Sequence, residues 1–278
     1  MRLSISNIAW DPVEDEAIAG LLHHFAVDAI DIAPGKYFPA PVKATGDEIN
    51  HVKNWWSERG IEIVGMQSLL FGTTGLNLFG SIESQDLMLL HLDAVCRIGA
   101  GLGAKHLVFG SPKNRDRIGL NDQAATDVAT SFFRRLGDIA ASHGVVICLE
   151  PNPAYYGANF MIDSTETATV VKTVNNPAIR MQLDTGSLAM NGEDALAVLE
   201  KNSHLIGHVH ASEPYLRPLG DDKTDHHRLA STIHRYLPNH VVTIEMLATK
   251  DESHEVSIER ALATAVLHYG NPEPKVIA

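Results

Sequence analysis

The chain alternates short apolar runs with longer amphipathic stretches from one end to the other. Eight runs have the composition of buried β-strands and none contains proline. They are Arg2–Ile8, Ala29–Ile32, Glu62–Ser68, His106–Phe109, Val145–Glu150, Arg180–Asp184, Gly207–His210 and Val242–Glu245. The stretches between them carry apolar residues at helical spacing. They are Glu14–Phe25, Asp47–Arg59, Gln85–Gly101, Asp122–His143, Ser164–Val174, Glu193–Lys201, His226–Tyr236 and Glu255–Tyr269. Strict alternation of this kind predicts a parallel sheet with helices packed on it.

Closure of this sheet into a barrel is favoured over an open, doubly wound sheet. No linker or low-complexity segment interrupts the eight units, and 278 residues suit a barrel, which commonly has about 250. An open nucleotide-binding sheet needs a glycine-rich loop after its first strand, whereas residues 7–12 contain no glycine. We therefore predict an α/β fold, a single (β/α)8 TIM barrel domain over residues 1–278.

The charge of the chain disfavours nucleic acids and anionic membranes as partners. The formal net charge is −12, with 34 acidic and 22 basic residues, and binding to such surfaces needs clustered lysine and arginine. The first ten residues do not resemble a secretory signal, and no apolar run approaches the roughly 18 residues of a membrane span. We expect a cytoplasmic protein in which the two cysteines, Cys96 and Cys148, are buried.

Ionisable residues stand at the ends of four consecutive predicted strands. The strands VVICLE, RMQLD, GHVH and VVTIE place Glu150, Asp184, His210 and Glu245 after apolar residues. In barrels of this kind, catalytic residues lie at the carboxyl ends of the strands. The two-residue period of a strand turns Cys148, Gln182, His208 and Thr243 to the same side as these four residues. His208 lies one layer deeper, where hydrogen bonding in support of the site is favoured over metal ligation.

Three carboxylates and one imidazole at one barrel mouth predict a divalent metal site. Without a cation the carboxylates would repel one another, and this ligand set suits Mn²⁺, Mg²⁺ or Co²⁺ better than a thiolate-preferring metal. We expect one ion, most simply Mn²⁺, with Zn²⁺ also possible. A single acidic residue at a strand end is usually a helix cap or part of an ion pair, but four on consecutive strands favour a metal.

Further polar residues follow the other strands on the same side. Lys36 follows the second strand, and Lys113, Arg115 and Arg117 follow the fourth. They could hold a phosphate or carboxylate, or could simply be solvated. Asn7 and Gln67 end the first and third strands and could bind hydroxyl groups. His106 begins its strand and is expected at the opposite face, while His226, His227 and His234 are expected to be exposed to solvent.

In these motifs the chain resembles the xylose isomerase-like barrel superfamily, especially its sugar phosphate isomerase/epimerase group and the ketose 3-epimerases. The motifs are LEPNP at 149–153, LDTGS at 183–187, GHVHASE at 207–213 and IEM at 244–246. The resemblance implies that Glu150, Asp184, His210 and Glu245 bind the metal. It also implies that Glu150 and Glu245 form the acid–base pair that moves a proton next to the substrate carbonyl.

The chain departs from those epimerases around the substrate. Their histidine three residues after the aspartate is replaced by Ser187, and the loop 154–158 has Tyr155 and Tyr156 but no acid. Arg217 lies seven residues after His210, whereas the epimerases have their substrate-binding arginine at six. The substrate contacts are therefore expected to differ. The candidate substrate-binding residues are Arg217, Ser187, Lys36, Gln67, Lys113, Arg115 and His208.

These residues favour a metal-dependent isomerase or epimerase that acts on a sugar, sugar acid or sugar phosphate through an enediolate. A dehydratase or lyase acting on a sugar or inositol derivative is the main alternative, since it begins with the same proton abstraction. A DNA-repair enzyme like endonuclease IV is disfavoured by Ser187 and the charge of −12. A non-catalytic binding protein is a further alternative. The expected partner is a small carbohydrate, and self-association into a homo-oligomer is possible.

Overall fold

A closed barrel of parallel strands forms the centre of the computed structural model, which describes residues 1–117 and 119–270. The strands follow one another around the barrel in chain order. Their bounds are β1 Leu3–Ser6, β2 Ala29–Ile32, β3 Glu62–Met66, β4 His106–Phe109, β5 Val146–Leu149, β6 Ile179–Asp184, β7 Ile206–Ser212 and β8 Val242–Glu245. The predicted (β/α)8 barrel is thus confirmed. The predicted domain end at residue 278 lies outside the described residues.

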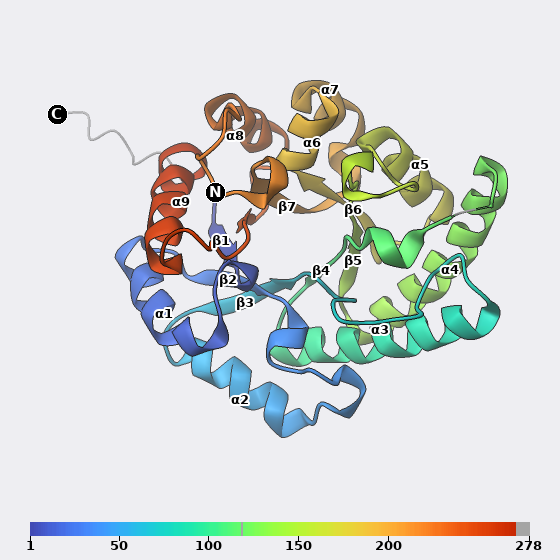
Figure 1. Ribbon diagram of the computed structural model, residues 1–278, viewed down its shortest axis with the longest axis horizontal. Coiled ribbons are helices and arrows are strands. Elements are labelled where there is room, and N and C mark those ends of the chain that lie inside the picture. The colour runs from blue at the N-terminus through green and yellow to red at the C-terminus, as the bar shows by residue number, and fades with distance from the viewer. Residues whose placement is uncertain (118, 271–278) are drawn as a thin grey trace.

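The helices form a ring around the strands (Figure 1). They are α1 Asp15–His24, α2 Gly46–Ser57, α3 Ile82–Leu102, α4 Asp122–His143, α5 Ser164–Val174, α6 Thr185–Asn191, α7 Ala195–Asn202, α8 His226–Tyr236 and α9 His254–Tyr269. Polar side chains begin several of them. The hydroxyl of Thr45 accepts from the amide of Glu48, and the carboxylate of Glu48 accepts from the amide of Thr45, which is a capping box.

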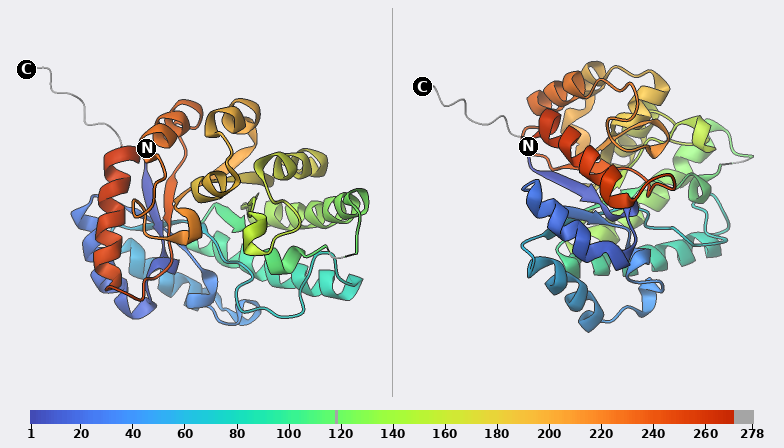
Figure 2. Two further views of the ribbon diagram at one scale, coloured as in Figure 1. Left: turned by 45° about the horizontal axis from the view of Figure 1, so that its top comes forward. Right: turned by 60° about the vertical axis from the view of Figure 1, so that its left-hand side comes forward.

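The ring closes where the two ends of the chain meet. β1 pairs with β8, with Leu3 opposite Val242 and Ile5 opposite Ile244. The last helix, α9, packs beside the first, α1, as both views of Figure 2 show. Closure leaves every strand with two hydrogen-bonded neighbours, so the barrel has no exposed sheet edge.

Two elements near the site differ from the predicted pattern. Helix α6 begins directly after β6, because the carboxylate of Asp184 accepts a 2.6 Å hydrogen bond from the amide of Ser187 and so caps a short helix. Strand β7 continues two residues beyond His210, since Ala211 and Ser212 pair with Ile244 and Glu245 of β8. His210 therefore lies inside its strand rather than at its end.

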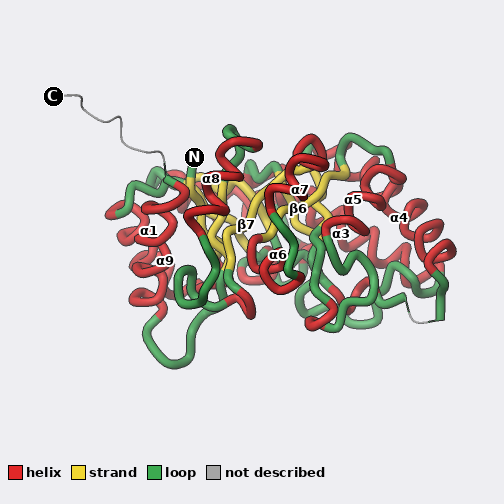
Figure 3. The backbone as a smooth tube through the Cα atoms, turned by 90° about the horizontal axis from the view of Figure 1, so that it is seen from above, coloured by secondary structure: helices red, strands yellow, loops and turns green. Residues whose placement is uncertain are grey.

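Apolar side chains fill the layer between strands and helices, and Cys96 and Cys148 are buried as predicted. The interior of the barrel also contains polar groups, among them Asp31, Gln182 and Thr243, which are fully buried. Figure 3 shows the strands enclosed by the helices, with loops at both ends of the barrel. In the part of the chain that the structure describes, no helix combines the length and apolarity needed to cross a membrane.

Candidate metal centre and active site

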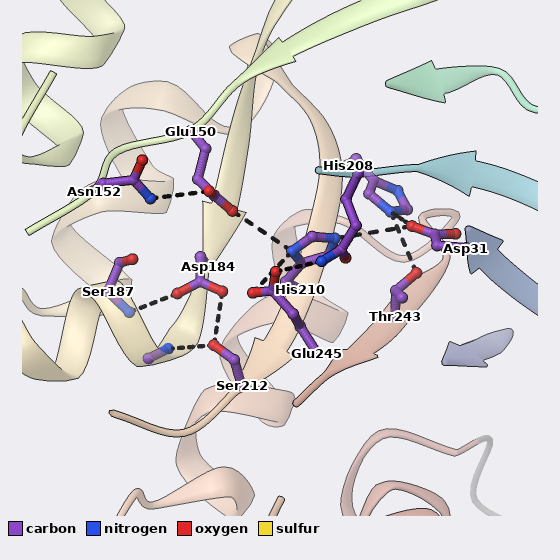
Figure 4. Close-up of polar contacts among 12 residues, drawn as sticks. Asp31, Glu150, Asn152, Asp184, Ser187, His208, His210, Ser212, Thr243 and Glu245 are labelled. Atoms are coloured by element: carbon purple, nitrogen blue, oxygen red, sulfur yellow. Dashed lines mark hydrogen bonds and ion pairs between the residues drawn. The ribbon is translucent and has the colours of Figure 1, made fainter. Parts of the chain in front are cut away.

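Four ionisable side chains converge at the carboxyl ends of β5 to β8 (Figure 4). Glu150, Asp184, His210 and Glu245 each offer one ligand atom, and these atoms all lie within 4.8 Å of one another. His210 is completely buried and the three carboxylates are 4–8% exposed. The structure therefore brings together the four residues that the sequence singled out for a metal.

The imidazole of His210 turns one nitrogen toward two of the carboxylates. Its Nδ1 lies 3.3 Å from Glu245 Oε2 and 3.6 Å from Glu150 Oε1. Its other nitrogen, Nε2, lies 3.8 Å from Asp31 Oδ2, deeper in the barrel. A ligand placed among the carboxylates would thus meet Nδ1 of His210.

Hydrogen bonds hold each carboxylate in place. The amide of Gln67 donates to Glu245 Oε1 at 2.7 Å, and the amide of Asn152 donates to Glu150 Oε2 at 2.9 Å. Asp184 accepts from the amide of Ser187 and, at 2.7 Å, from the hydroxyl of Ser212. Each carboxylate is therefore oriented by groups outside the set of four, which fixes a ligand before a metal binds.

The electrostatics of the cluster favour a bound cation. Burial raises the pKa of Asp184 to about 7, and repulsion from Glu245 and Glu150 adds to this effect. Burial opposes the charge on Glu245 as well, but the attraction of His210 outweighs it and lowers its pKa. Burial would lower the pKa of His210, yet Glu245 and the other nearby acids raise it well above the usual value. Three carboxylates thus share one imidazolium, and a divalent ion would compensate their charge more fully.

The donor set fits a divalent metal ion on two further observations. Glu150 Oε1, which faces His210, has no hydrogen-bond partner among the described residues although it is buried. Gly110 leaves room for this carboxylate, because a Cβ atom there would lie 2.0 Å from Glu150 Oε2. Three oxygens and one nitrogen are the hard ligands expected for Mn²⁺ or Mg²⁺, while a described cysteine near the site, Cys148, is not part of the cluster.

A cavity of about 510 Å³ opens over the cluster. Its walls include Glu150, Asp184 and Glu245, and three of the predicted substrate-binding residues, Lys36, Gln67 and Ser187. The other four, Lys113, Arg115, Arg217 and His208, do not line it. Lys113 is exposed, and the guanidinium of Arg217 pairs with Asp222 at 3.3 Å on the surface.

Arg115 lies beneath the site instead of in it. The side chain is fully buried, and its guanidinium donates to the carbonyl of Glu150 at 2.8 Å and to the side-chain oxygen of Asn152. Burial lowers the pKa of Arg115 to about 10, which still leaves it charged at neutral pH. Its contacts hold the chain just after β5, where a ligand residue and its amide partner stand two positions apart.

A column of buried polar groups continues below the cluster. His208 is 2% exposed and its Nε2 lies 2.6 Å from Asp31 Oδ2 and 3.3 Å from the hydroxyl of Thr243. The His106 ring stacks on the His208 ring, with centroids 5.5 Å apart. His208 thus has the deeper, hydrogen-bonded position predicted for it. Sequence reasoning missed Asp31, although a charged residue within the apolar run AIDI needs a buried partner.

The expectation that His226 is exposed was wrong. It is 4% exposed, and its ring nitrogens lie 2.8 Å from Glu213 Oε1 and 2.8 Å from the hydroxyl of Tyr269. Glu213 follows β7, lines the cavity and also accepts from the amide of Gly220 and the hydroxyl of Thr224. These contacts fasten the loop after β7 to α8 and α9, which the helical pattern alone did not indicate.

Comparison with known proteins identifies the family. Residues 21–265 match the family described as xylose isomerase-like TIM barrel. The chain belongs to this family. No curated protein sequence matches the chain significantly.

Several solved structures share the fold over the full length of the chain. D-psicose 3-epimerase from Clostridium cellulolyticum H10, solved with D-tagatose, has a TM-score of 0.81 and 15% identity, covering 97% of this chain and 99% of that one. A 3-keto-D-glucoside 4-epimerase from E. coli has a TM-score of 0.75 and 18% identity, covering 95% and 98%. The IOLI protein with a bound zinc atom has a TM-score of 0.75 and 16% identity, covering 97% and 98%. At these identities the similarity establishes the fold.

Proposed function

We propose that this protein is a divalent-metal-dependent isomerase or epimerase that moves a proton next to the carbonyl group of a sugar-type substrate. The observation that carries the proposal is the buried cluster of Glu150, Asp184, His210 and Glu245 at the floor of an open cavity. Structural relatives named as sugar epimerases, and one that binds zinc, support it.

In this proposal the four residues hold one ion, with Mn²⁺ as the best match to the donor set. A bound divalent ion supplies a positive charge that polarises the substrate carbonyl and stabilises an enediolate. Glu150 and Glu245 are the two groups that remove and return the proton. Gln67 and Asn152 orient their carboxylates through hydrogen bonds of 2.7 and 2.9 Å, so that the reacting oxygens face the cavity.

The amide and hydroxyl groups around the cavity orient the substrate. Gln67 and Ser187 line the cavity beside Glu245 and Asp184, where they can contact substrate hydroxyl groups. The buried Arg115 is a positioning residue in this account, because it holds Glu150 and Asn152 and does not reach the cavity. His208 is likewise placed to support His210 through Asp31 and not to contact substrate.

The experiment that tests the proposal is solvent isotope uptake by metal-loaded protein in D₂O. D-psicose, D-fructose, D-tagatose, L-ribulose and a 3-keto-glucoside form the substrate panel, analysed by NMR and mass spectrometry. We expect deuterium at the carbon next to the carbonyl of at least one substrate, lost on chelation and in Glu150→Gln and Glu245→Gln. The exposed Glu62→Gln is the control. Product with the mass of a dehydrated substrate would instead identify a lyase, and absence of exchange across the panel would contradict the proposal.

A further inference from the structure

The cavity over the cluster is larger than one sugar ring requires. Its volume of about 510 Å³ falls within the range of about 300–1,000 Å³ that is typical of sites for drug-sized ligands. A monosaccharide seated on the carboxylates at its floor would leave the upper part unfilled. The residues of that upper part therefore bear on what else the substrate carries.

The walls above the floor are apolar. After β3, the side chains of Leu69, Leu70 and Phe71 line the cavity, and Leu216 and Leu247 line it from the loops after β7 and β8. The loops after β3 and after β7 and β8 stand on different sides of the barrel mouth, because β4 to β6 separate them on one side and β1 and β2 on the other. The polar lining groups, by contrast, gather around the carboxylates.

Two of these apolar side chains are exposed although nothing in the fold requires it. Phe71 is 84% exposed and Leu247 is 50% exposed at the rim. Tyr156, 37% exposed, also lines the cavity, and its hydroxyl accepts a 2.9 Å hydrogen bond from the amide of Tyr215. This bond holds an aromatic ring at the rim. Exposed apolar surface continuous with a polar site is a common feature of ligand-binding sites.

The cavity offers little to a charged substituent. Lys36 is the cation among its described lining residues, and its ammonium group already donates to the carbonyl of Trp10. The other basic residues considered for a phosphate lie elsewhere, with Arg115 fully buried and Arg217 paired with Asp222. Glu150, Asp184, Glu213 and Glu245 line the same cavity and would repel an anion.

We propose that the substrate is an uncharged sugar that bears an apolar substituent, an aryl group above all. The sugar lies over the carboxylate cluster, and the substituent lies between the Leu69–Phe71 segment and the pair Leu216 and Leu247. The proposal rests on the proposed function in that both place the sugar at the same cluster. It excludes sugar phosphates, which the sequence left open.

Calorimetric titration of the Mn²⁺-loaded protein tests this assignment by binding alone. The probes are the phenyl and methyl glycosides of D-glucose and of D-galactose, together with glucose 6-phosphate. We expect a phenyl glycoside to bind at least about tenfold more tightly than the methyl glycoside of the same sugar, and more tightly than the phosphate. Equal affinity within each pair, tighter binding of the phosphate, or no binding of any probe overturns the proposal.

Rim variants locate the preference. Phe71→Ala and Leu247→Ala should each reduce the ratio of phenyl to methyl affinity several-fold. Leu267→Ala, which removes an equally apolar side chain that is 77% exposed on α9, should leave the ratio unchanged. An unchanged ratio in both rim variants would also overturn the proposal.

The outcome is independent of the isotope experiment. Deuterium uptake into free ketoses without an aryl preference would leave the proposed function intact and refute this inference. An aryl preference without deuterium uptake would support the inference and count against the isomerase.

Discussion

Asn152 holds Glu150 by one oxygen and leaves the other free. Its amide donates a 2.9 Å hydrogen bond to Glu150 Oε2, and Glu150 Oε1, 3.6 Å from His210 Nδ1, has no hydrogen-bond partner among the described residues. The arrangement separates two tasks within one carboxylate. One oxygen fixes the orientation, and the other is available to a metal or a proton.

Replacement of Asn152 by leucine should therefore weaken metal binding without unfolding the protein. The Glu150 carboxylate would lose its orienting partner, and changes of this kind typically cost about 10–100-fold in metal affinity or activity. Mn²⁺ affinity measured by calorimetry checks the change. Asn191→Leu, on the exposed surface, is the matched control, and equal affinity in both variants would refute the role given to Asn152.

Gly110 should tolerate no side chain. A Cβ atom there would lie 2.0 Å from Glu150 Oε2, so Gly110→Ala has to displace the Glu150 carboxylate. We expect a loss of metal affinity comparable with that of Asn152→Leu. Gly35→Ala is the control, because Gly35 lines the same cavity and has no atom within 4 Å of its Cβ position. A crystal structure of Gly110→Ala with Glu150 unmoved would contradict this reading.

Asp184 should destabilise the metal-free protein at neutral pH. Burial and repulsion from Glu245 raise its pKa to about 7, above the ordinary value of 3.8. Its charged form is therefore disfavoured in the folded state, and this contribution lowers the free energy of unfolding as pH rises from about 4 to 7. Asp184→Asn keeps a good helix cap and should raise the free energy of unfolding of the metal-free protein at pH 8 by roughly 1–3 kcal/mol.

Asp31 provides the contrasting control for that measurement. It is fully buried like its counterpart, but the neighbouring His208 outweighs the effect of burial and lowers its pKa. Asp31→Asn should therefore reduce the free energy of unfolding at pH 8, where Asp184→Asn raises it. Urea denaturation in the presence of a chelator distinguishes them, and shifts of the same sign would refute the electrostatic account.

His106 should make the protein sensitive to mild acid. Burial lowers its pKa to about 4, from 6.5, and the neighbouring His208 contributes to this. The unfolded chain therefore binds the proton more readily, so the free energy of unfolding falls as pH drops below 6.5. We expect His106→Phe, which retains a ring to stack on His208, to remove a loss of about 2 kcal/mol between pH 7.5 and 5. Identical pH dependence of unfolding in both proteins would contradict this.

The sequence predicted the barrel and its cluster because both depend on local patterns. Apolar runs that end in Glu150, Asp184 or Glu245 mark strands whose carboxyl ends meet at one mouth, and the two-residue period turns His208 and His210 inward. The short helix α6 was missed, because its cap, Asp184, had been considered only as a ligand.

Contacts between distant segments could not be derived in this way. The pair of Asp31 and His208 spans 177 residues and forms only when the barrel closes. The basic run after β4 gave no sign that Arg115 is buried against Asn152 while Lys113 is exposed. Similarly, the burial of His226 depends on Tyr269, 43 residues away on another helix.

Metal stoichiometry tests the central claim most directly. Metal-free protein dialysed against Mn²⁺ and then analysed for its metal content should carry one ion per chain, held by the cluster of Glu150, Asp184, His210 and Glu245. His210→Ala should abolish this binding, and His234→Ala, which removes an exposed histidine of α8, should retain it. A wild-type protein without bound metal, or equal metal content in both variants, would contradict the account.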